Sequence, residues 1–279
     1  MTQRDSRRRA GPRALLVACL AAIALAAIAT AYARGPDIGP APGSVALPAT
    51  PSSPSRSSSP TREPLGSTGS GIVQIGRNGD SAWAPVISPT AARSAPSVNA
   101  RLVGRVATTT PEGTSTIVPA LRRTARAGNL WVEIGLPVLP NGTTGWVRRS
   151  ALGGYEFLNT RLDVSLRTRT ITLSRAGKRV FTAPIGVGQA KWPTPKGTFL
   201  IRNKLTRYAS PTYGPLAFGT SARSAVLTDW PAGGFIGIHG TDRPGLIPGR
   251  ISHGCVRLRN ADITRLARLM PLGTPVTIH

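Results

Sequence analysis

The chain has 279 residues, 40% of them hydrophobic but only 5% aromatic, so it can form one large or two small domains around aliphatic cores. Lys and Arg number 35 against 11 Asp and Glu, a formal net charge of +24. Such an excess suits a polyanionic surrounding: nucleic acid, membrane headgroups or an anionic cell wall. The basic residues are scattered, and no zinc-finger, helix-turn-helix or RRM signature accompanies them, which argues against nucleic acid.

Residues 1–33 form an N-terminal targeting segment. Arginines at positions 7–9 and 13 precede an apolar run over 14–33 that ends in Ala31-Tyr32-Ala33, a small-x-small cleavage pattern. The run also reaches the roughly 20 residues that a membrane-spanning helix needs. A cleaved signal peptide and an uncleaved membrane anchor are therefore both open. Either places the remainder outside the cytoplasm, in the cell wall or periplasmic space, because the positive end stays inside.

Residues 34–70 are rich in Pro, Ser, Gly and Thr and poor in apolar side chains. Such a segment buries too little surface to offset its ordering entropy, which predicts a disordered, extended linker. It is either a spacer that holds the rest of the chain away from the membrane or a secretion linker without a particular role.

Residues 71–154 alternate short strand-like pieces with turn residues. Leu130 to Ile134 reads as a strand, Asn141-Gly142 is a turn signal, and Gly145-Trp146-Val147 continues the pattern. The stretch over about 90–152 loosely resembles a bacterial SH3-like barrel, a kind of module that often binds peptides or wall glycan. A small structural domain packed on its neighbour is the alternative interpretation.

Residues 155–279 carry a denser pattern of strands. Apolar and polar residues alternate through Leu162, Val164 and Leu166, and further apolar pieces follow near 171–173, 180–187, 200–201 and 276–278. One helix is expected after Asn260, which is predicted to cap it; its apolar face and its stop are Ile263, Leu266, Leu269, Met270 and Pro271. The turns are spaced as in a β-sandwich or barrel.

The residues that point to chemistry lie late in the chain. Cys255 is the only cysteine outside the N-terminal apolar run, which holds Cys19. A lone thiol is a buried, unreactive side chain, one half of an intermolecular disulfide, or a nucleophile. A glycine-rich apolar strand ends in His239-Gly240, and thirteen positions after His239 comes Ser252-His253-Gly254-Cys255. A cysteine nucleophile needs a neighbouring base to lower its pKa, and an imidazole stabilises the thiolate and shuttles the proton.

Three details of these motifs support a nucleophile. Gly237 is expected to allow close approach of another backbone, and Gly240 leaves one side of His239 unshielded. Gly254 permits a tight turn whose N–H groups converge, as an oxyanion hole requires. His239, His253 and Cys255 could supply three of the about four ligands of a structural zinc site. A nucleophile with its base explains these residues better, so no metal or cofactor is expected. Whether His239 or His253 is the base stays open on these grounds.

The constellation resembles the catalytic domain of L,D-transpeptidases of the YkuD type, whose pattern is His-Gly, a spacer and Ser/Thr-His-Gly-Cys. Thr194-Pro195-Lys196-Gly197 and Tyr213-Gly214-Pro215 also look like that family, and the resemblance covers about 157–279. It implies a mostly β chain: a mixed β-sandwich catalytic domain over 155–279 with one or two short helices, preceded by the SH3-like β domain and the disordered linker.

The resemblance also implies roles. Cys255 is the nucleophile and His239 the general base, with orienting or oxyanion roles for Gly240, Ser252, His253 and Gly254. Arg257 replaces an Asn that some members carry, and it is expected to bind a stem-peptide carboxylate. Tyr213 is a further substrate-binding candidate. The segment between Lys204 and Trp230, with Tyr208 and Tyr213, is expected either to cover the site as a lid or to place its aromatic residues in the core.

The reaction that the resemblance implies takes a peptidoglycan tetrapeptide stem as acyl donor. A thioester on the cysteine passes to an amine of a second stem, which gives a 3→3 crosslink, and carbapenems inactivate such enzymes. Three other acceptors are possible: water, a protein or a D-amino acid. With water as the acceptor, the enzyme would be an L,D-carboxypeptidase. From another class, the chain is a non-enzymatic protein that binds the anionic cell wall by charge. In every case peptidoglycan is the expected partner, with the membrane added if the N-terminal segment stays uncleaved.

Overall fold

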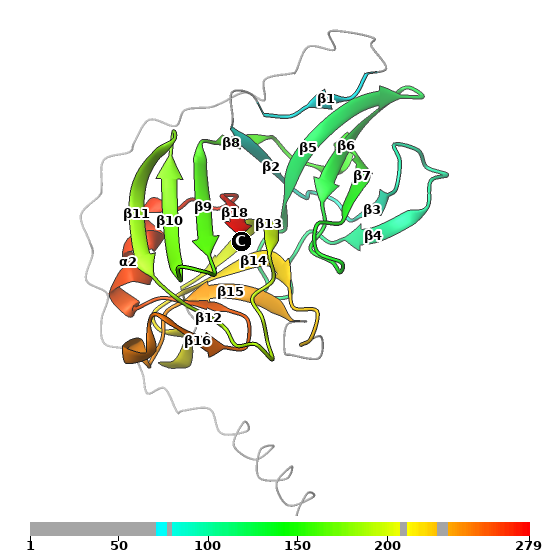
Figure 1. Cartoon of the computed structure of the whole chain (residues 1–279). Helices are drawn as coiled ribbons and strands as arrows, with labels where there is room; N and C mark the ends of the chain where they lie inside the picture. The colour runs from blue at the N-terminus through cyan, green and yellow to red at the C-terminus, as the bar shows by residue number, and fades with distance from the viewer. Residues whose placement is uncertain (1–70, 77–79, 207–210, 228–233) are drawn as a thin grey trace, which may run out of the picture. The chain divides into compact units, whose positions relative to one another are not determined.

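The computed structural model describes residues 71–76, 80–206, 211–227 and 234–279. The expectations for the targeting segment, the linker, Cys19, Tyr208 and Trp230 fall outside these residues. The described part is mostly β, as expected, and its strands form two sheets (Figure 1). It contains one α-helix and three 3₁₀ turns, η1 (Arg149–Ala151), η2 (Pro211–Tyr213) and η3 (Pro244–Leu246). No helix within the described ranges is long and apolar enough to cross a membrane.

The first sheet contains β1 to β8 and is antiparallel throughout. Its order is β4-β3-β7-β6-β5-β2-β8, and β1 pairs with β5. The strands are β1 (Val73–Gln74), β2 (Ser81–Pro85), β3 (Thr90–Arg93), β4 (Leu102–Val106), β5 (Ile117–Arg126), β6 (Asn129–Gly135), β7 (Thr144–Arg148) and β8 (Glu156–Leu158).

The first sheet has a hydrophobic cluster of its own, which includes Ala84, Val132, Ile134 and Val147. The two residues between β5 and β6, Ala127 and Gly128, both have positive φ (49° and 71°). Two consecutive positive φ values are typical of a two-residue hairpin turn, whose twist matches the twist of the strands that it joins. The expected turn at Asn141-Gly142 lies between β6 and β7. The likeness of this part to an SH3-like barrel stays a prediction.

The second sheet contains β9 to β18 in the order β11-β10-β9-β18-β13-β14-β15-β17-β12-β16. It is mixed, because β9 with β18, β15 with β17 and β12 with β16 are parallel pairs. The strands are β9 (Thr160–Ser165), β10 (Thr170–Arg175), β11 (Lys178–Pro184), β12 (Gly186–Gly188), β13 (Gly197–Leu205), β14 (Ala217–Arg223), β15 (Phe235–His239), β16 (Gly249–Ser252), β17 (Val256–Arg257) and β18 (Pro275–Ile278).

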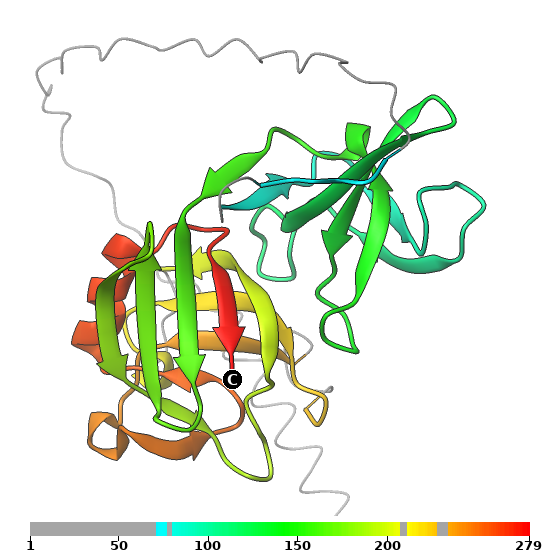
Figure 2. The ribbon, with the colours of Figure 1, turned by 45° about the horizontal axis from the view of Figure 1, so that its top comes forward.

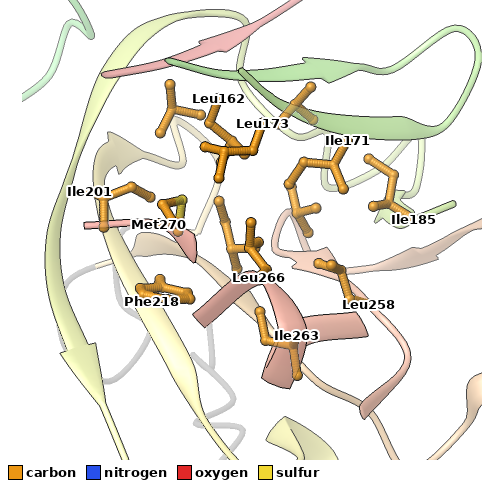
Figure 3. Close-up of a cluster of buried hydrophobic side chains, with 14 of the residues drawn as sticks. Leu162, Ile171, Leu173, Ile185, Ile201, Phe218, Leu258, Ile263, Leu266 and Met270 are labelled. Carbon is orange, nitrogen blue, oxygen red and sulfur yellow. The ribbon is translucent and has the colours of Figure 1, made fainter. Parts of the chain in front are cut away.

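The second sheet bends over a core of its own. Figure 2 shows β9, β10 and β11 facing the strands around β14 and β15. Leu162 and Leu173 reach into this space from one side, and Ile201 and Phe218 reach into it from the other (Figure 3). All four are 0% exposed. The alternation read from the sequence therefore identifies the inward face correctly, because side chains on a strand point alternately to its two faces.

The helix α2 (Asn260–Leu269) closes this core (Figure 3). Ile263 and Leu266 are fully buried, as the apolar periodicity predicts. The expected cap is wrong by one position, because Arg259 occupies the N-cap without a side-chain hydrogen bond and Asn260 is the first helical residue. The Asn260 side chain is used elsewhere, as described below.

Candidate active site

Two parallel strands bring the motif residues to one face. In the pairing of β15 with β17, Ile238 lies opposite Val256 and His239 opposite Arg257. Ile236 and Ile238 point into the core, so Phe235, Gly237 and His239 point to the other face. By the same alternation Cys255 shares a face with Arg257. The two sequence motifs, far apart in the chain, are thus neighbours.

The missing side chain of Gly237 leaves room between the histidine and the thiol. A Cβ atom placed on Gly237 would lie 3.7 Å from His239 Cδ2 and 3.8 Å from Cys255 Sγ. The closest backbone atom to that point is the Phe218 carbonyl oxygen at 3.5 Å. The Phe218 backbone and the His239 and Cys255 side chains therefore all lie beside Gly237 at ordinary van der Waals distances.

His239 is held in a single useful tautomer. Its Nδ1 lies 2.6 Å from the Gly240 carbonyl oxygen. A carbonyl only accepts, so Nδ1 carries the proton and Nε2 is left as a proton acceptor. The residue is 2% exposed, and its ring packs against Tyr213 with centroids 4.5 Å apart. Burial lowers the His239 pKa to about 4; the Gly240 carbonyl opposes this shift and the Arg257 charge adds to it.

Cys255 is partly exposed and accepts a hydrogen bond from the Gly237 N–H at 3.3 Å. Burial raises the pKa of the thiol, although the Gly237 N–H and the Arg257 charge both act to lower it. At neutral pH the resting pair is therefore a thiol and a neutral imidazole. A thiolate stabilised by imidazolium, as expected from the sequence, would then form only as the reaction proceeds.

The loop that carries Cys255 is fixed by hydroxyl groups. Ser252 Oγ donates to the Cys255 carbonyl (2.6 Å) and accepts from the Gly254 N–H (3.1 Å). Thr194 Oγ1 donates to the Gly254 carbonyl (2.7 Å) and accepts from the Gly188 N–H (2.9 Å). Gly254 has φ +116°, which only glycine adopts readily. Its N–H is engaged within the loop, which leaves the amides of His253 and Cys255 as oxyanion candidates.

His253 has a different environment from His239. It is exposed, and its ring packs against Trp192 with centroids 4.1 Å apart. His239, by contrast, is buried and has its tautomer fixed by the Gly240 carbonyl, which favours His239 as the base. Throughout the described ranges, no three His, Cys, Asp or Glu residues gather to hold a metal ion.

The motif residues open into a cavity of about 210 Å³. Among its lining residues are five of the eight predicted site residues: His239, Cys255, His253, Arg257 and Tyr213. Ser252, Gly254 and Gly240 stand behind them as supports. The Nε atom of Arg257 is buried without a hydrogen-bond partner among the described residues. Arg257 itself lines the cavity with Cys255, so its guanidinium group is a candidate to bind a carboxylate of a ligand.

Sequence reasoning missed several lining residues: Thr212, Ser224, Leu227, Gly234, Phe235 and Ile236. The period-2 alternation from His239 was a usable signal for Phe235. Thr212, Ser224 and Leu227 lie in the segment between Lys204 and Trp230 that is expected to cover the site. Lys204 belongs to β13 and the stretch 217–223 is the interior strand β14, so among the described residues of that segment the cavity is lined by these three and Tyr213.

Comparison with known proteins agrees with this geometry. Residues 159–278 match the family model described as YkuD, L,D-transpeptidase catalytic domain. These residues form a YkuD domain. Proteins of Bacillus licheniformis and Bacillus subtilis, each named as a candidate L,D-transpeptidase YkuD, are 36% identical to the chain over 118 residues. The match covers 42% of this chain and 64% and 65% of theirs.

The solved structures include an Enterococcus faecium L,D-transpeptidase that is 24% identical. The match covers 43% of this chain and 50% of that one, with a TM-score of 0.35. The residues that match the family model contain every predicted site residue and all strands of the second sheet.

Proposed function

We propose that the chain is a peptidoglycan L,D-transpeptidase that forms 3→3 crosslinks through a thioester on Cys255. The observation that carries the proposal is that His239 and Cys255 both lie beside Gly237 and line one cavity. The imidazole donates through Nδ1 to Gly240, and its Nε2 is left to accept a proton. Peptidoglycan stems, an extracytoplasmic location and inactivation by carbapenems follow from the same proposal.

In the acylation step the thiol attacks a carbonyl carbon of the donor stem. As the sulfur–carbon bond forms, the thiol proton moves to His239 Nε2, and the Gly240 carbonyl stabilises the imidazolium through Nδ1–H. Because both groups are neutral at rest, charge separates only as the tetrahedral intermediate forms. The amides of His253 and Cys255 are the proposed donors to its oxyanion.

Collapse of that intermediate breaks the peptide bond to the terminal D-Ala, whose amine leaves with the proton from His239. The thioester remains. In the second half, an amine of another stem attacks the thioester carbonyl and gives its proton to His239. Collapse then forms the crosslink, and the proton returns from His239 to the sulfur. No cofactor is required, since each step transfers an acyl group and a proton.

Arg257 is proposed to hold a carboxylate of the donor stem. Arg257 lines the same cavity as the thiol, and a guanidinium group binds carboxylates through two parallel hydrogen bonds. Tyr213 packs on His239 and would then shape the cavity from the imidazole side.

The test uses the purified full-length protein and disaccharide tetrapeptide stems. Mass spectrometry is expected to find 3→3 dimers with loss of one D-Ala per crosslink, and one carbapenem added to Cys255. A Cys255→Ala variant should lose both, while His253→Gln should keep acylation by the carbapenem. Dimers from the Cys255→Ala variant would refute the thioester. Tripeptides without dimers would favour a carboxypeptidase, and salt-sensitive binding to sacculi without any reaction would favour a wall-binding protein.

A further inference from the structure

Both polar groups of the peptide unit between Gly240 and Thr241 make hydrogen bonds to side chains. Its carbonyl accepts from His239 Nδ1 at 2.6 Å, and its N–H donates to Asn260 Oδ1 at 2.9 Å. The two groups belong to one rigid plane, since the peptide bond does not rotate. A contact that fixes the N–H therefore also fixes the direction of the carbonyl that holds the histidine.

The space around the Asn260 amide is made by two glycines. A Cβ on Gly214 would lie 2.3 Å from Asn260 Oδ1, and one on Gly240 would lie 2.4 Å from it. Gly214 also has φ +66° and directly follows Tyr213, whose ring packs on His239. The amide oxygen of Asn260 thus lies beside both chain segments that support the imidazole.

Asn260 is not used as a helix cap. It is the first residue of α2, where the N-cap position belongs to Arg259 and lacks a side-chain bond. The residue as a whole is exposed, but its oxygen reaches the N–H of Thr241, which is only 1% exposed. Without that oxygen, a buried N–H would lose its partner or the peptide plane would turn toward another one.

We propose that Asn260 is a positioning residue that fixes the tautomer of His239 through the Gly240–Thr241 peptide. This inference rests on the proposed function, in which His239 accepts the thiol proton at Nε2. If the plane turns, Nδ1–H loses its acceptor and the proton moves to Nε2 in part of the molecules. Those molecules cannot accept a proton from Cys255. Misplacement of a catalytic group by about 1 Å costs on the order of a hundredfold in rate.

The experiment compares Asn260→Ala and Asn260→Asp in the full-length protein. Asp keeps an acceptor oxygen at the same place, so it should restore most of what Ala loses. Asp262→Ala is the matched control, since it changes an acidic residue in the same first helical turn away from the peptide. The readouts are the rate of Cys255 acylation by imipenem and the ¹⁵N shifts of His239, which distinguish the two tautomers.

The expected result for Asn260→Ala is acylation slowed about ten- to hundredfold, with mixed His239 tautomers, while Asp262→Ala resembles the wild type in both. A single Nδ1–H tautomer in Asn260→Ala, or an equal slowing in the control, would overturn the proposal. If Asn260→Ala does not fold, Asn260→Ser should show the same slowing of acylation and the same mixture of His239 tautomers. A wild type that reacts with imipenem but makes no dimers would end the crosslinking proposal and leave this one standing.

Discussion

The buried neutral state of His239 predicts a specific dependence of stability on pH. Its pKa is lowered from 6.5 to about 4, chiefly by burial. Between these two values the unfolded chain binds a proton that the folded protein does not bind. The free energy of unfolding should therefore fall as the pH falls from 6.5 toward 4, and His239 adds no slope above pH 6.5. Each tenfold change in proton affinity is worth about 1.4 kcal/mol, so His239 accounts for a loss of about 3 kcal/mol.

The assay is urea unfolding of the wild type and of His239→Gln at several pH values from 4 to 7.5. The difference between the two curves isolates His239, because all other titrating groups are common to both proteins. A His239→Gln variant that loses as much stability as the wild type between pH 6.5 and 4 would refute the idea that the imidazole is buried and neutral.

Other changes test the remaining contacts. The methyl group of a Gly237→Ala variant fits without a clash, so the melting temperature of the variant should hardly change. Because that methyl group lies beside both His239 and Cys255, it should slow carbapenem acylation about a hundredfold. Acylation at the wild-type rate would contradict the geometry. Alkylation of Cys255 by iodoacetamide should keep accelerating above pH 9, because the thiol pKa is raised, whereas a plateau from below pH 7 would indicate a preformed thiolate. Thr194→Val should lower the free energy of unfolding by about 2–4 kcal/mol, since two buried backbone groups lose their partner, and Thr194→Ser should restore most of it. Arg257→Gln should raise the KM for a donor with a free carboxylate about ten- to hundredfold, with Arg257→Lys intermediate; an equal change for an amidated donor would argue against a carboxylate contact.

The sequence predicted the second sheet well where alternation decided it. Leu162 and Val164 are fully buried as their spacing requires, and Ile263 and Leu266 form the inward face of α2. The motifs also identified the residues around the thiol, since a His-Gly and a Ser-His-Gly-Cys need few other features to be recognised. Local patterns were enough there because each describes one strand, one turn or one helix.

The sequence could not predict contacts that arise from long-range pairing. Ser224 and Leu227 reach the cavity only because β14 lies beside β15. The neutral resting pair depends on how completely the fold removes water from His239, which no spacing reveals. Asn260 shows the same limit. From the sequence its side chain could cap the helix or bind another backbone group, and only the fold shows that it accepts a hydrogen bond from the Thr241 N–H.

The strand nearest the C-terminus, β18, has a central place in the second sheet. It pairs with β9 on one side and with β13 on the other, and no other strand joins these two. Without β18 the sheet would therefore be two unconnected ribbons, one with β9 to β11 and one with β12 to β17. The histidine and the thiol both belong to the second ribbon, and part of the core that supports them comes from the first. A cut that removes β18 would thus separate the reactive residues from half of their scaffold.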